Sequence, residues 1–219
     1  MHASTPFRIV VLLSGNGSNL QAIIDAIENQ TLPAEISAVI SNRPDAYGLE
    51  RAKTHGIATH VIDHTKYADR QSFDKQLAQR IDHYQPDLVV LAGFMRILTD
   101  DFVNHYSGRM INIHPSLLPA YQGLNTHQRV LEDGCTEHGA TVHFVIPKLD
   151  SGPIILQARI PVTTDDSVKT LQQRVHAIEH RLYPEAIRRI ATGQVRFSNG
   201  VVYYNDNPIT AQDWQFTAV

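Results

Sequence analysis

A glycine-rich turn between an apolar strand and an amphipathic helix is the first feature of this sequence that can do chemistry. Residues 14–19 read S-G-N-G-S-N, directly after the apolar stretch Arg8–Leu13 and before a helix predicted to begin near Leu20. Gly15 and Gly17 permit backbone angles and close approaches that a Cβ atom would forbid. The N–H groups at a helix start are unpaired and carry partial positive charge, so this turn is suited to bind a phosphate.

The turn matches neither of the common nucleotide-binding fingerprints. G-x-G-x-x-G would need a third glycine where Leu20 stands, and a P-loop would need Gly-Lys followed by Ser or Thr. Ser18 or Asn19 is expected to cap the following helix. A tight strand-to-helix turn without any ligand is the second interpretation, and the turn by itself leaves both open.

Polar side chains at the end of a later strand form a second candidate site. Residues 111–119 read I-N-I-H-P-S-L-L-P. Asn112 and His114 point to the same side, because side chains alternate along a strand. Pro115 and Pro119 end the strand and stiffen its exit. The alternative is a strand-end histidine that only bonds a backbone carbonyl, which is the commoner role of an isolated histidine.

Asp150 is a candidate partner for that histidine. It lies in the turn P-K-L-D-S-G-P between two apolar stretches. An aspartate before Ser-Gly-Pro is usually a turn former. Its functional interpretation depends on proximity to His114, which only the fold decides.

The pattern H-x-x-E-H at His176, Glu179 and His180 spells an inverted zinc-protease signature. A catalytic zinc needs a third protein ligand. Only Glu185, Asp206 and Asp213 follow, and none has a helpful context. With 12 histidines in the chain, a chance match is expected, and we predict no metal site.

Composition indicates a globular protein of the cytoplasm. The chain has 219 residues, 42% of them hydrophobic, which is enough to bury the core of one domain. A net charge of −3, with scattered Lys and Arg, argues against a nucleic-acid partner. The single cysteine, Cys135, excludes internal disulfides and fits a reducing compartment. A short polar N-terminus and the lack of long apolar runs predict neither a signal peptide nor membrane association.

Alternating strand and helix patterns predict an α/β fold, with an open, mostly parallel sheet flanked by helices and later strands able to run antiparallel. The predicted strands are Arg8–Leu13, Glu35–Ile40, Ala58–Ile62, Asp87–Ala92, Met110–Ile113, Thr141–Ile146 and Pro153–Ile160. The later predicted helices are Tyr47–His55 (capped by Asp45), Arg70–Tyr84, one within 123–133, and Val168–Ile190, in which Pro184 forces a kink or a restart. Val195–Phe197 and Val201–Tyr204 read as a short C-terminal hairpin.

Several stretches together resemble the folate-dependent glycinamide ribonucleotide (GAR) transformylases, the phosphoribosylglycinamide formyltransferases of purine biosynthesis. They are S-G-N-G-S-N-L-Q-A (14–22), A-G-F-M-R-I-L (92–98), I-N-I-H-P-S-L-L-P (111–119), H-G-A-T-V-H-F-V (138–145) and L-D-S-G-P-I-I-L-Q (149–157). The resemblance runs from about residue 8 to residue 190. Asn-x-His-Pro-Ser with a later aspartate is shared by a wider formyltransferase group, whereas S-G-N-G-S-N is similar to the GAR enzymes in particular.

The resemblance implies a Rossmann-like formyltransferase sheet in a single domain, residues 1–219. A phosphate-binding half would cover about 7–105, a folate and catalytic half about 106–192, and a tail 193–219. The implied reaction moves the formyl group of 10-formyltetrahydrofolate to the amine of GAR. Asn112 and a protonated His114 would bond the tetrahedral oxyanion. His114 would also transfer a proton, and Asp150 would favour the charged imidazole and fix its orientation.

The resemblance also implies binding residues. Gly17, Ser18 and Asn19 would hold the substrate phosphate, and His176 and Glu179 would contact its sugar or glycinamide part, although a glutamine-like amide is expected at His176. Gln122 and Asn125 also depart from the family pattern. The folate residues would be Arg70, Met95, Arg96, Ile97, Leu98, Asn112, Ile146, Pro147, Lys148, Leu149 and Asp150. No metal and no covalent intermediate are needed, so Cys135 has no task. The expected partners are small molecules only, with the chain a monomer or weak homodimer.

Other functions remain open at this stage. A formyltetrahydrofolate hydrolase would be expected to carry an N-terminal regulatory domain, whereas the first strand here begins at residue 8. An initiator-tRNA formyltransferase would need a basic RNA-binding extension. A non-catalytic nucleotide-binding module would leave Asn112, His114 and Asp150 unexplained as a set.

Overall fold

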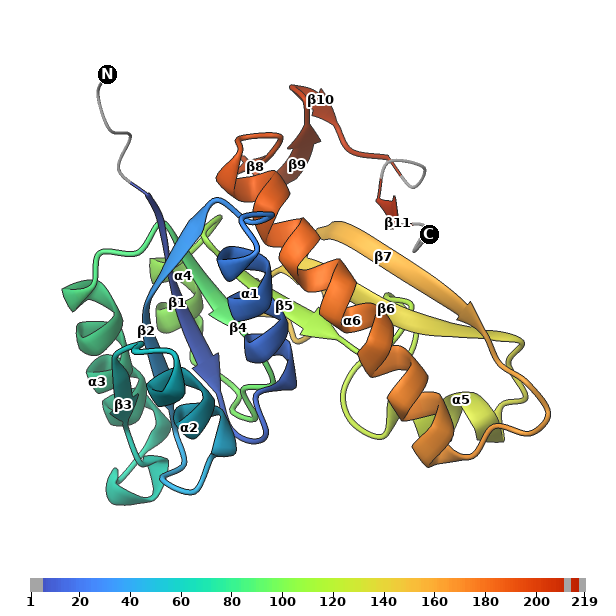
Figure 1. Ribbon diagram of the computed structural model, residues 1–219, viewed down its shortest axis with the longest axis horizontal. Coiled ribbons are helices and arrows are strands. Elements are labelled where there is room, and N and C mark those ends of the chain that lie inside the picture. The colour runs from blue at the N-terminus through green and yellow to red at the C-terminus, as the bar shows by residue number, and fades with distance from the viewer. Residues whose placement is uncertain (1–5, 211–213, 217–219) are drawn as a thin grey trace. The chain divides into compact units, whose positions relative to one another are not determined.

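The computed structural model describes residues 6–210 and 214–216 (Figure 1). The chain divides into two compact units, the first ending at Ile111 and the second beginning at Asn112. The N-terminal residues 1–5, where no signal peptide is predicted, lie outside the described residues. So do residues 211–213 and 217–219 of the predicted tail.

The first unit contains a parallel sheet. Its strands, in sheet order, are β4 (Leu88–Leu91), β1 (Phe7–Leu13), β2 (Ala34–Ser41) and β3 (Thr59–Val61). β1 pairs in parallel with both β2 and β4, and β2 pairs in parallel with β3. The apolar run at Ile9–Leu13 is completely buried, which is why its residues show no alternation. The four strands predicted for this part of the chain are confirmed.

Helices connect these strands, each with an apolar face turned inward. They are α1 (Ser18–Glu28), α2 (Tyr47–Thr54), α3 (Arg70–His83) and α4 (Asp100–His105), together with the 3-10 turn η1 (His64–Lys66). α1 buries Leu20, Ile23 and Ile24, at the spacing of one helical face. The sequence patterns did not predict α4, a short helix of six residues.

Two predicted helix caps are wrong. α1 begins at Ser18 and its N-cap is Gly17, so neither Ser18 nor Asn19 caps it. α2 has Ala46 as its N-cap, and the Asp45 carboxylate instead accepts hydrogen bonds from the Arg43 guanidinium. An exposed arginine two residues away competes successfully for that carboxylate, because the charged pair needs little reordering of the chain.

The second unit has a mixed sheet. β5 (Met110–His114) leads into it, and the sheet order is β5, β6 (Glu137–Phe144), β7 (Ile154–Pro161) and β11 (Gln215–Phe216). β6 and β7 are antiparallel, as the sequence allowed, while β11 runs parallel to β7. α5 (Thr126–Glu132) follows β5, and the long helix α6 (Val168–Ala191) packs on β6 and β7.

α6 begins with a capping box, in which the Ser167 hydroxyl accepts from the Thr170 N–H and the Thr170 hydroxyl accepts from the Ser167 N–H. It then continues through Pro184 as one helix of 24 residues, so the predicted restart does not occur. Burial of the apolar face of α6, which includes Leu171, Val175 and Leu182, outweighs the backbone hydrogen bond that the proline removes.

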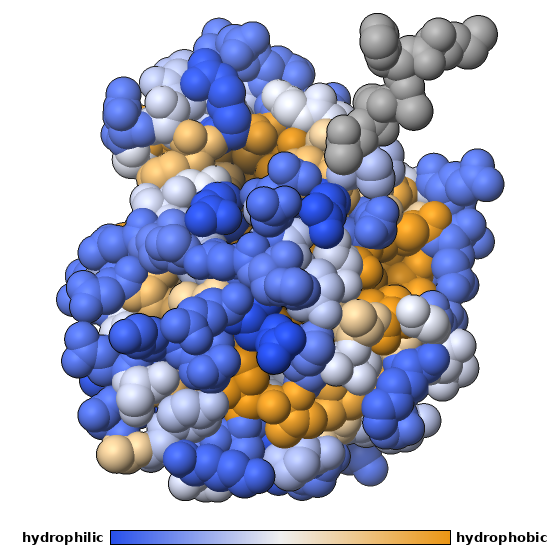
Figure 2. All heavy atoms as spheres, turned by 90° about the vertical axis from the view of Figure 1, so that its left-hand side faces the viewer, coloured by the Kyte–Doolittle hydropathy of each residue, from blue (hydrophilic) through white to orange (hydrophobic). Residues whose placement is uncertain are grey.

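The predicted hairpin is confirmed as β8 (Val195–Ser198) and β9 (Val201–Tyr204), and β10 (Asn207–Pro208) extends it. Asn199 and Gly200 both have positive φ, at 50° and 80°, as a two-residue hairpin turn requires. No helix in the described part of the chain combines the length and apolar character needed to cross a membrane. Figure 2 shows polar and charged side chains over most of the face in view, with apolar atoms between them, as on typical protein surfaces.

Candidate active site

The fold of the second unit brings Asp150 next to His114. His114 ends β5, and Asp150 lies in the loop that joins β6 to β7. The Oδ2 atom of Asp150 is 3.5 Å from Nδ1 of His114, and both side chains are only 8% exposed. Asn112, two residues earlier on the same strand, is half-buried. The strand and the turn that seemed unrelated in the sequence therefore present a buried imidazole to a buried carboxylate.

The hydrogen bonds of His114 determine which ring nitrogen can exchange a proton. Nε2 lies 2.9 Å from the carbonyl oxygen of Tyr121. A carbonyl only accepts, so Nε2 must carry a hydrogen. Nδ1 faces the carboxylate of Asp150 and is the nitrogen that can gain or lose a proton without breaking that bond.

Backbone and side-chain donors hold Asp150 in place. Its Oδ2 accepts from the Gly123 N–H at 3.0 Å, and the Gln122 side chain donates to its carbonyl at 3.1 Å. Both Gly123 (φ 79°) and Asp150 (φ 46°) adopt left-handed backbone angles, so both loops are tightly turned here. Gln122, which departs from the family pattern, thus helps to fix Asp150.

The glycine-rich turn of the first unit is supported by α2. Gly17 has a φ of 75°, and a Cβ on it would lie 2.6 Å from the Cα of Gly48. The Gly48 N–H donates to the Gly15 carbonyl at 3.0 Å, and the Arg51 guanidinium donates to the Asn16 carbonyl at 2.9 Å. Glycine at position 17 is needed for its backbone angle and for the close approach of α2. The N-cap residue of α1 is Gly17, which has no side chain to cap the helix, and this suits a helix start that binds an anion.

Most of the candidate folate residues fall into two segments. Met95–Leu98, in the first unit, is irregular and joins β4 to α4; Met95 and Ile97 are 69% and 61% exposed. The Arg96 guanidinium stacks on the Phe73 ring at 5.8 Å, and Arg70 is the first residue of α3. In the second unit, Ile146–Asp150 follows β6 and exposes the Leu149 side chain. Exposed apolar side chains in both segments suit contact with a flat heteroaromatic ring.

His176 and Glu179 lie on α6. Glu179 is buried, whereas His176 is half-buried, and burial lowers the pKa of His176. The rings of His176 and His180 stack with their centroids 6.4 Å apart. Among the residues that the structure describes, no three His, Cys, Asp or Glu side chains gather in a group that could bind a metal.

Comparison with known proteins identifies the family. The formyl transferase family model matches residues 7–187. The Escherichia coli (strain K12) phosphoribosylglycinamide formyltransferase is 50% identical, over 94% of this chain and 97% of that protein. The phosphoribosylglycinamide formyltransferase structure from Coxiella burnetii, solved with CHES, superposes with a TM-score of 0.93 at 54% identity, covering 97% of this chain and 100% of that one.

The chain belongs to the phosphoribosylglycinamide formyltransferase family. The human trifunctional purine biosynthetic protein adenosine-3 is also similar, 46% identical over 89% of this chain but only 19% of that protein. The expected fold class, a mostly parallel formyltransferase sheet flanked by helices with a small hairpin, is confirmed, and so is the assignment as a formyltransferase enzyme.

Within this phosphoribosylglycinamide formyltransferase fold, His143 lies next to Asn112 and Asp150, although no local sequence pattern points to it. It lies on β6, almost fully buried, and its Nδ1 is 2.9 Å from the Phe144 carbonyl oxygen. Nδ1 therefore carries the hydrogen, and burial lowers the pKa of the ring. The neutral Nε2 accepts from the Asn112 side-chain nitrogen at 3.3 Å, and it lies 3.9 Å from Asp150 Oδ1. His143 thus orients the Asn112 amide. Only its place in H-G-A-T-V-H-F-V could have indicated it.

A buried histidine pair lies nearby in the second unit of this formyltransferase. His127 on α5 and His138 on β6 are 3.0 Å apart, Nδ1 to Nε2. One ring must donate and the other accept, so both can be neutral in this arrangement. Burial lowers the pKa of each to about 4. This bond links α5 to the sheet, and it is lost when both rings are protonated because neither nitrogen can then accept.

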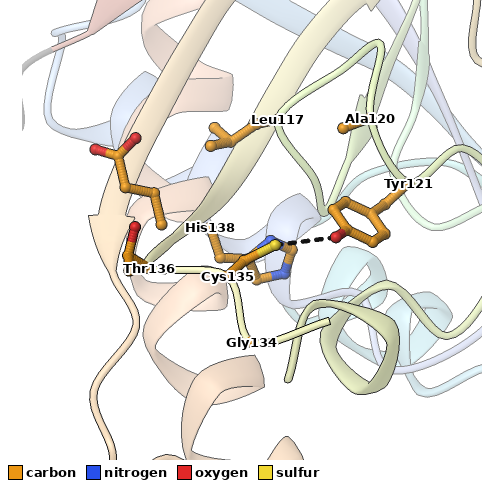
Figure 3. Close-up of a pocket in the computed structure, with 8 residues that line it drawn as sticks. Leu117, Ala120, Tyr121, Gly134, Cys135, Thr136 and His138 are labelled. Atoms are coloured by element: carbon orange, nitrogen blue, oxygen red, sulfur yellow. Dashed lines mark hydrogen bonds between the residues drawn. The ribbon is translucent and has the colours of Figure 1, made fainter. Parts of the chain in front are cut away.

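A pocket of about 430 Å³ lies beside His138. The Tyr121 ring and Cys135 are among the side chains that line it (Figure 3). The Tyr121 hydroxyl donates to Asp133 at 2.7 Å and lies 3.0 Å from the Cys135 sulfur. Asn112, His114 and Asp150 do not line this pocket. The pocket is connected to the candidate residues through Tyr121, whose carbonyl accepts from His114.

Proposed function

We propose that Asn112, His114 and Asp150 catalyse transfer of the formyl group of 10-formyltetrahydrofolate to the amine of GAR, the reaction of the family in de novo purine synthesis. The products are formylglycinamide ribonucleotide and tetrahydrofolate. The supporting observation is the orientation of His114: its Nε2 is bonded to a carbonyl, while its Nδ1 faces Asp150 at 3.5 Å.

The chemistry needs an oxyanion stabiliser and a proton carrier. The neutral amine attacks the formyl carbon and forms a tetrahedral oxyanion next to a new ammonium. Asn112, held by His143, donates a side-chain N–H to that oxyanion. His114 donates a second hydrogen bond while it is protonated, and Nδ1 is its exchanging nitrogen. The attacking nitrogen loses a proton and the folate nitrogen gains one, with His114 as the carrier. Collapse of the oxyanion then breaks the bond between the formyl carbon and the folate nitrogen, which releases tetrahydrofolate and leaves the formyl group on the GAR amine. The negative Asp150 stabilises the charged ring during this exchange.

The binding roles are proposed on the same basis. Gly17, Ser18 and Asn19 would hold the phosphate at the uncapped start of α1. His176 and Glu179 would contact the rest of GAR. Residues that would bind the reduced folate, which is a co-substrate, are Arg70, Met95, Arg96, Ile97, Leu98, Asn112, Ile146, Pro147, Lys148, Leu149 and Asp150. No step of this scheme uses a metal ion. We further propose a cytoplasmic enzyme that is a monomer or a weak homodimer, to be checked by sedimentation at several protein concentrations.

The acceptor specificity tests this function. Release of tetrahydrofolate is followed by absorbance with GAR, with water alone, and with charged initiator tRNA. Rapid release that requires GAR, together with formylglycinamide ribonucleotide as the product, is the expected result. Release without GAR would indicate a formyltetrahydrofolate hydrolase, and transfer to the tRNA would indicate an initiator-tRNA formyltransferase. Binding of GAR without any turnover would indicate a nucleotide-binding module.

A further inference from the structure

The segment Met95–Leu98 has no regular structure, yet buried side chains hold both of its ends. At its start, the Met95 N–H donates to the Ser14 hydroxyl at 2.7 Å. Immediately after it, the Thr99 N–H donates to Asp74 Oδ2 at 2.6 Å. Both acceptors belong to the first unit, as does the segment itself. An irregular segment held in this way has a defined backbone conformation despite its exposed side chains.

The Ser14 hydroxyl is oriented by a second bond. Ser14 is 6% exposed, and its hydroxyl donates to Asn42 Oδ1 at 2.6 Å. Because its only hydrogen is used in that bond, a lone pair faces the Met95 N–H. The Ser14 N–H also donates to the Gly93 carbonyl at 3.0 Å. Ser14, the first residue of S-G-N-G-S-N, therefore bonds the start of the folate segment and not only its own turn.

Asp74 is an unusual residue for the buried face of a helix. It lies on α3 beside Phe73 and is 3% exposed. Burial raises the pKa of its carboxyl, while the charges of Arg70 and Arg96 act in the opposite direction. Its Oδ1 is buried without a hydrogen-bond partner among the described residues, so the bond to Thr99 accounts for its placement. Thr99 is in turn the N-cap of α4.

We propose that Ser14 and Asp74 are positioning residues for the folate, which fix the two ends of Met95–Leu98 so that its backbone groups bind the pterin ring in a set geometry. This inference rests on the proposed function, in which this segment holds the pterin. A bound ring gains most from donors and acceptors that are ordered before it arrives. Loss of either anchor therefore weakens folate binding more than GAR binding.

The phosphate turn does not depend on these anchors. The Gly48 N–H donates to the Gly15 carbonyl, and Arg51 donates to the Asn16 carbonyl, so α2 holds this part of the turn through bonds that involve neither the Ser14 hydroxyl nor Asp74. Loss of an anchor should therefore change the Kd for the folate more than the Kd for GAR, although Ser14 is adjacent to Gly15 in the chain.

The test uses Ser14→Ala and Asp74→Ala in the full chain, with a matched control for each. Ser41→Ala removes another buried serine hydroxyl that accepts one backbone N–H, from Arg43. Asp82→Ala removes another carboxylate of α3. That carboxylate accepts a hydrogen bond from the hydroxyl of Tyr106, the C-cap residue of α4. Measurements are KM and Kd for the folate and for GAR, with Tm for each variant.

For Ser14→Ala and Asp74→Ala, the Kd for the folate should rise about tenfold, as expected when a buried N–H loses its acceptor, with the Kd for GAR changed less than about twofold. The control variants should lower Tm without raising the Kd for the folate more than the Kd for GAR. Asp74→Asn keeps an acceptor oxygen and should recover most of the folate affinity that Asp74→Ala loses. Ser14→Cys, close to serine in size but a poor acceptor, tests the anchor without opening a cavity if Ser14→Ala does not fold.

Equal losses for both substrates, or a folate Kd for Asp74→Asn as weak as that for Asp74→Ala, would overturn the inference. So would a Ser14→Cys variant with unchanged folate affinity. Failure of the proposed function has a different signature, because the unaltered protein would then not transfer formyl groups to GAR.

Discussion

The Oδ2 atom of Asp150 lies 3.5 Å from Nδ1 of His114, while the Tyr121 carbonyl accepts from Nε2, the other nitrogen of the ring. The imidazole is held between a neutral acceptor and a negative one, so it can change protonation without changing orientation. Such a fixed ring is well suited to move a proton between two nitrogens of bound substrates.

If Asp150 acts through His114, the effects of replacing them should not add. Asp150→Asn should lower kcat because a neutral amide no longer stabilises the charged ring. His114→Ala should be more severe, since it removes both a proton carrier and an oxyanion donor. The double variant should be little worse than His114→Ala, as expected of residues that act as a unit. Steady-state kinetics with both substrates give the kcat of each single variant and of the double variant. Fully multiplicative losses would show that Asp150 works independently.

His143 should act through Asn112. Asn112→Ala is expected to reduce kcat roughly 10²–10³-fold, the size of effect known for oxyanion donors. His143→Ala should also reduce kcat, but less, because Asn112 is then present without its orienting bond at 3.3 Å. In an Asn112→Ala background, replacing His143 should change kcat little further. A large additional loss there would mean that His143 has a separate role.

Two glycines of the same turn should differ in their tolerance of a methyl group. Gly17→Ala would place a Cβ 2.6 Å from Gly48 at a φ of 75°, so it should lower Tm and raise the KM for GAR more than that for the folate. At Gly15, nothing lies within 4 Å of the added Cβ, so Gly15→Ala should fold with nearly unchanged Tm. Thermal melts and substrate titrations compare the two. Equal loss of Tm would contradict the packing explanation.

Stability should fall as the pH falls from about 6.5 toward 4, partly because of the buried pair His127 and His138. The pKa of each is lowered to about 4, from 6.5 for an exposed ring. The unfolded chain therefore binds more protons within this window, and the stabilisation is complete only above it. His127→Gln should make the free energy of unfolding less dependent on pH, as measured by urea unfolding at pH 5 and pH 7. The exposed His83→Gln serves as the control and should keep the dependence of the unaltered protein.

The sequence by itself determined most strands of the sheet, though not β11, and the identity of the main candidate residues. Fully apolar runs such as Val10–Leu13 are typical of strands buried on both faces, because a strand with one face in water would alternate apolar and polar residues. The period of a strand put Asn112 and His114 on one side, and Asn199-Gly200 specified a hairpin turn. These features depend on interactions between near neighbours in the chain, which a sequence displays directly.

Only the tertiary structure decided which partners those residues have. His143 looks like an ordinary strand residue in H-G-A-T-V-H-F-V, yet it bonds Asn112 on another strand. The Asp45 carboxylate bonds Arg43 and does not cap α2. Pro184 lies within a continuous helix because burial of one face of α6 compensates for the backbone hydrogen bond that the proline removes. In the sequence alone, Asp150 could equally be a simple turn former. The packing of β6 and β7 in the fold places it next to His114. Contacts between residues distant in sequence arise from the packing of whole elements, and no local pattern encodes them.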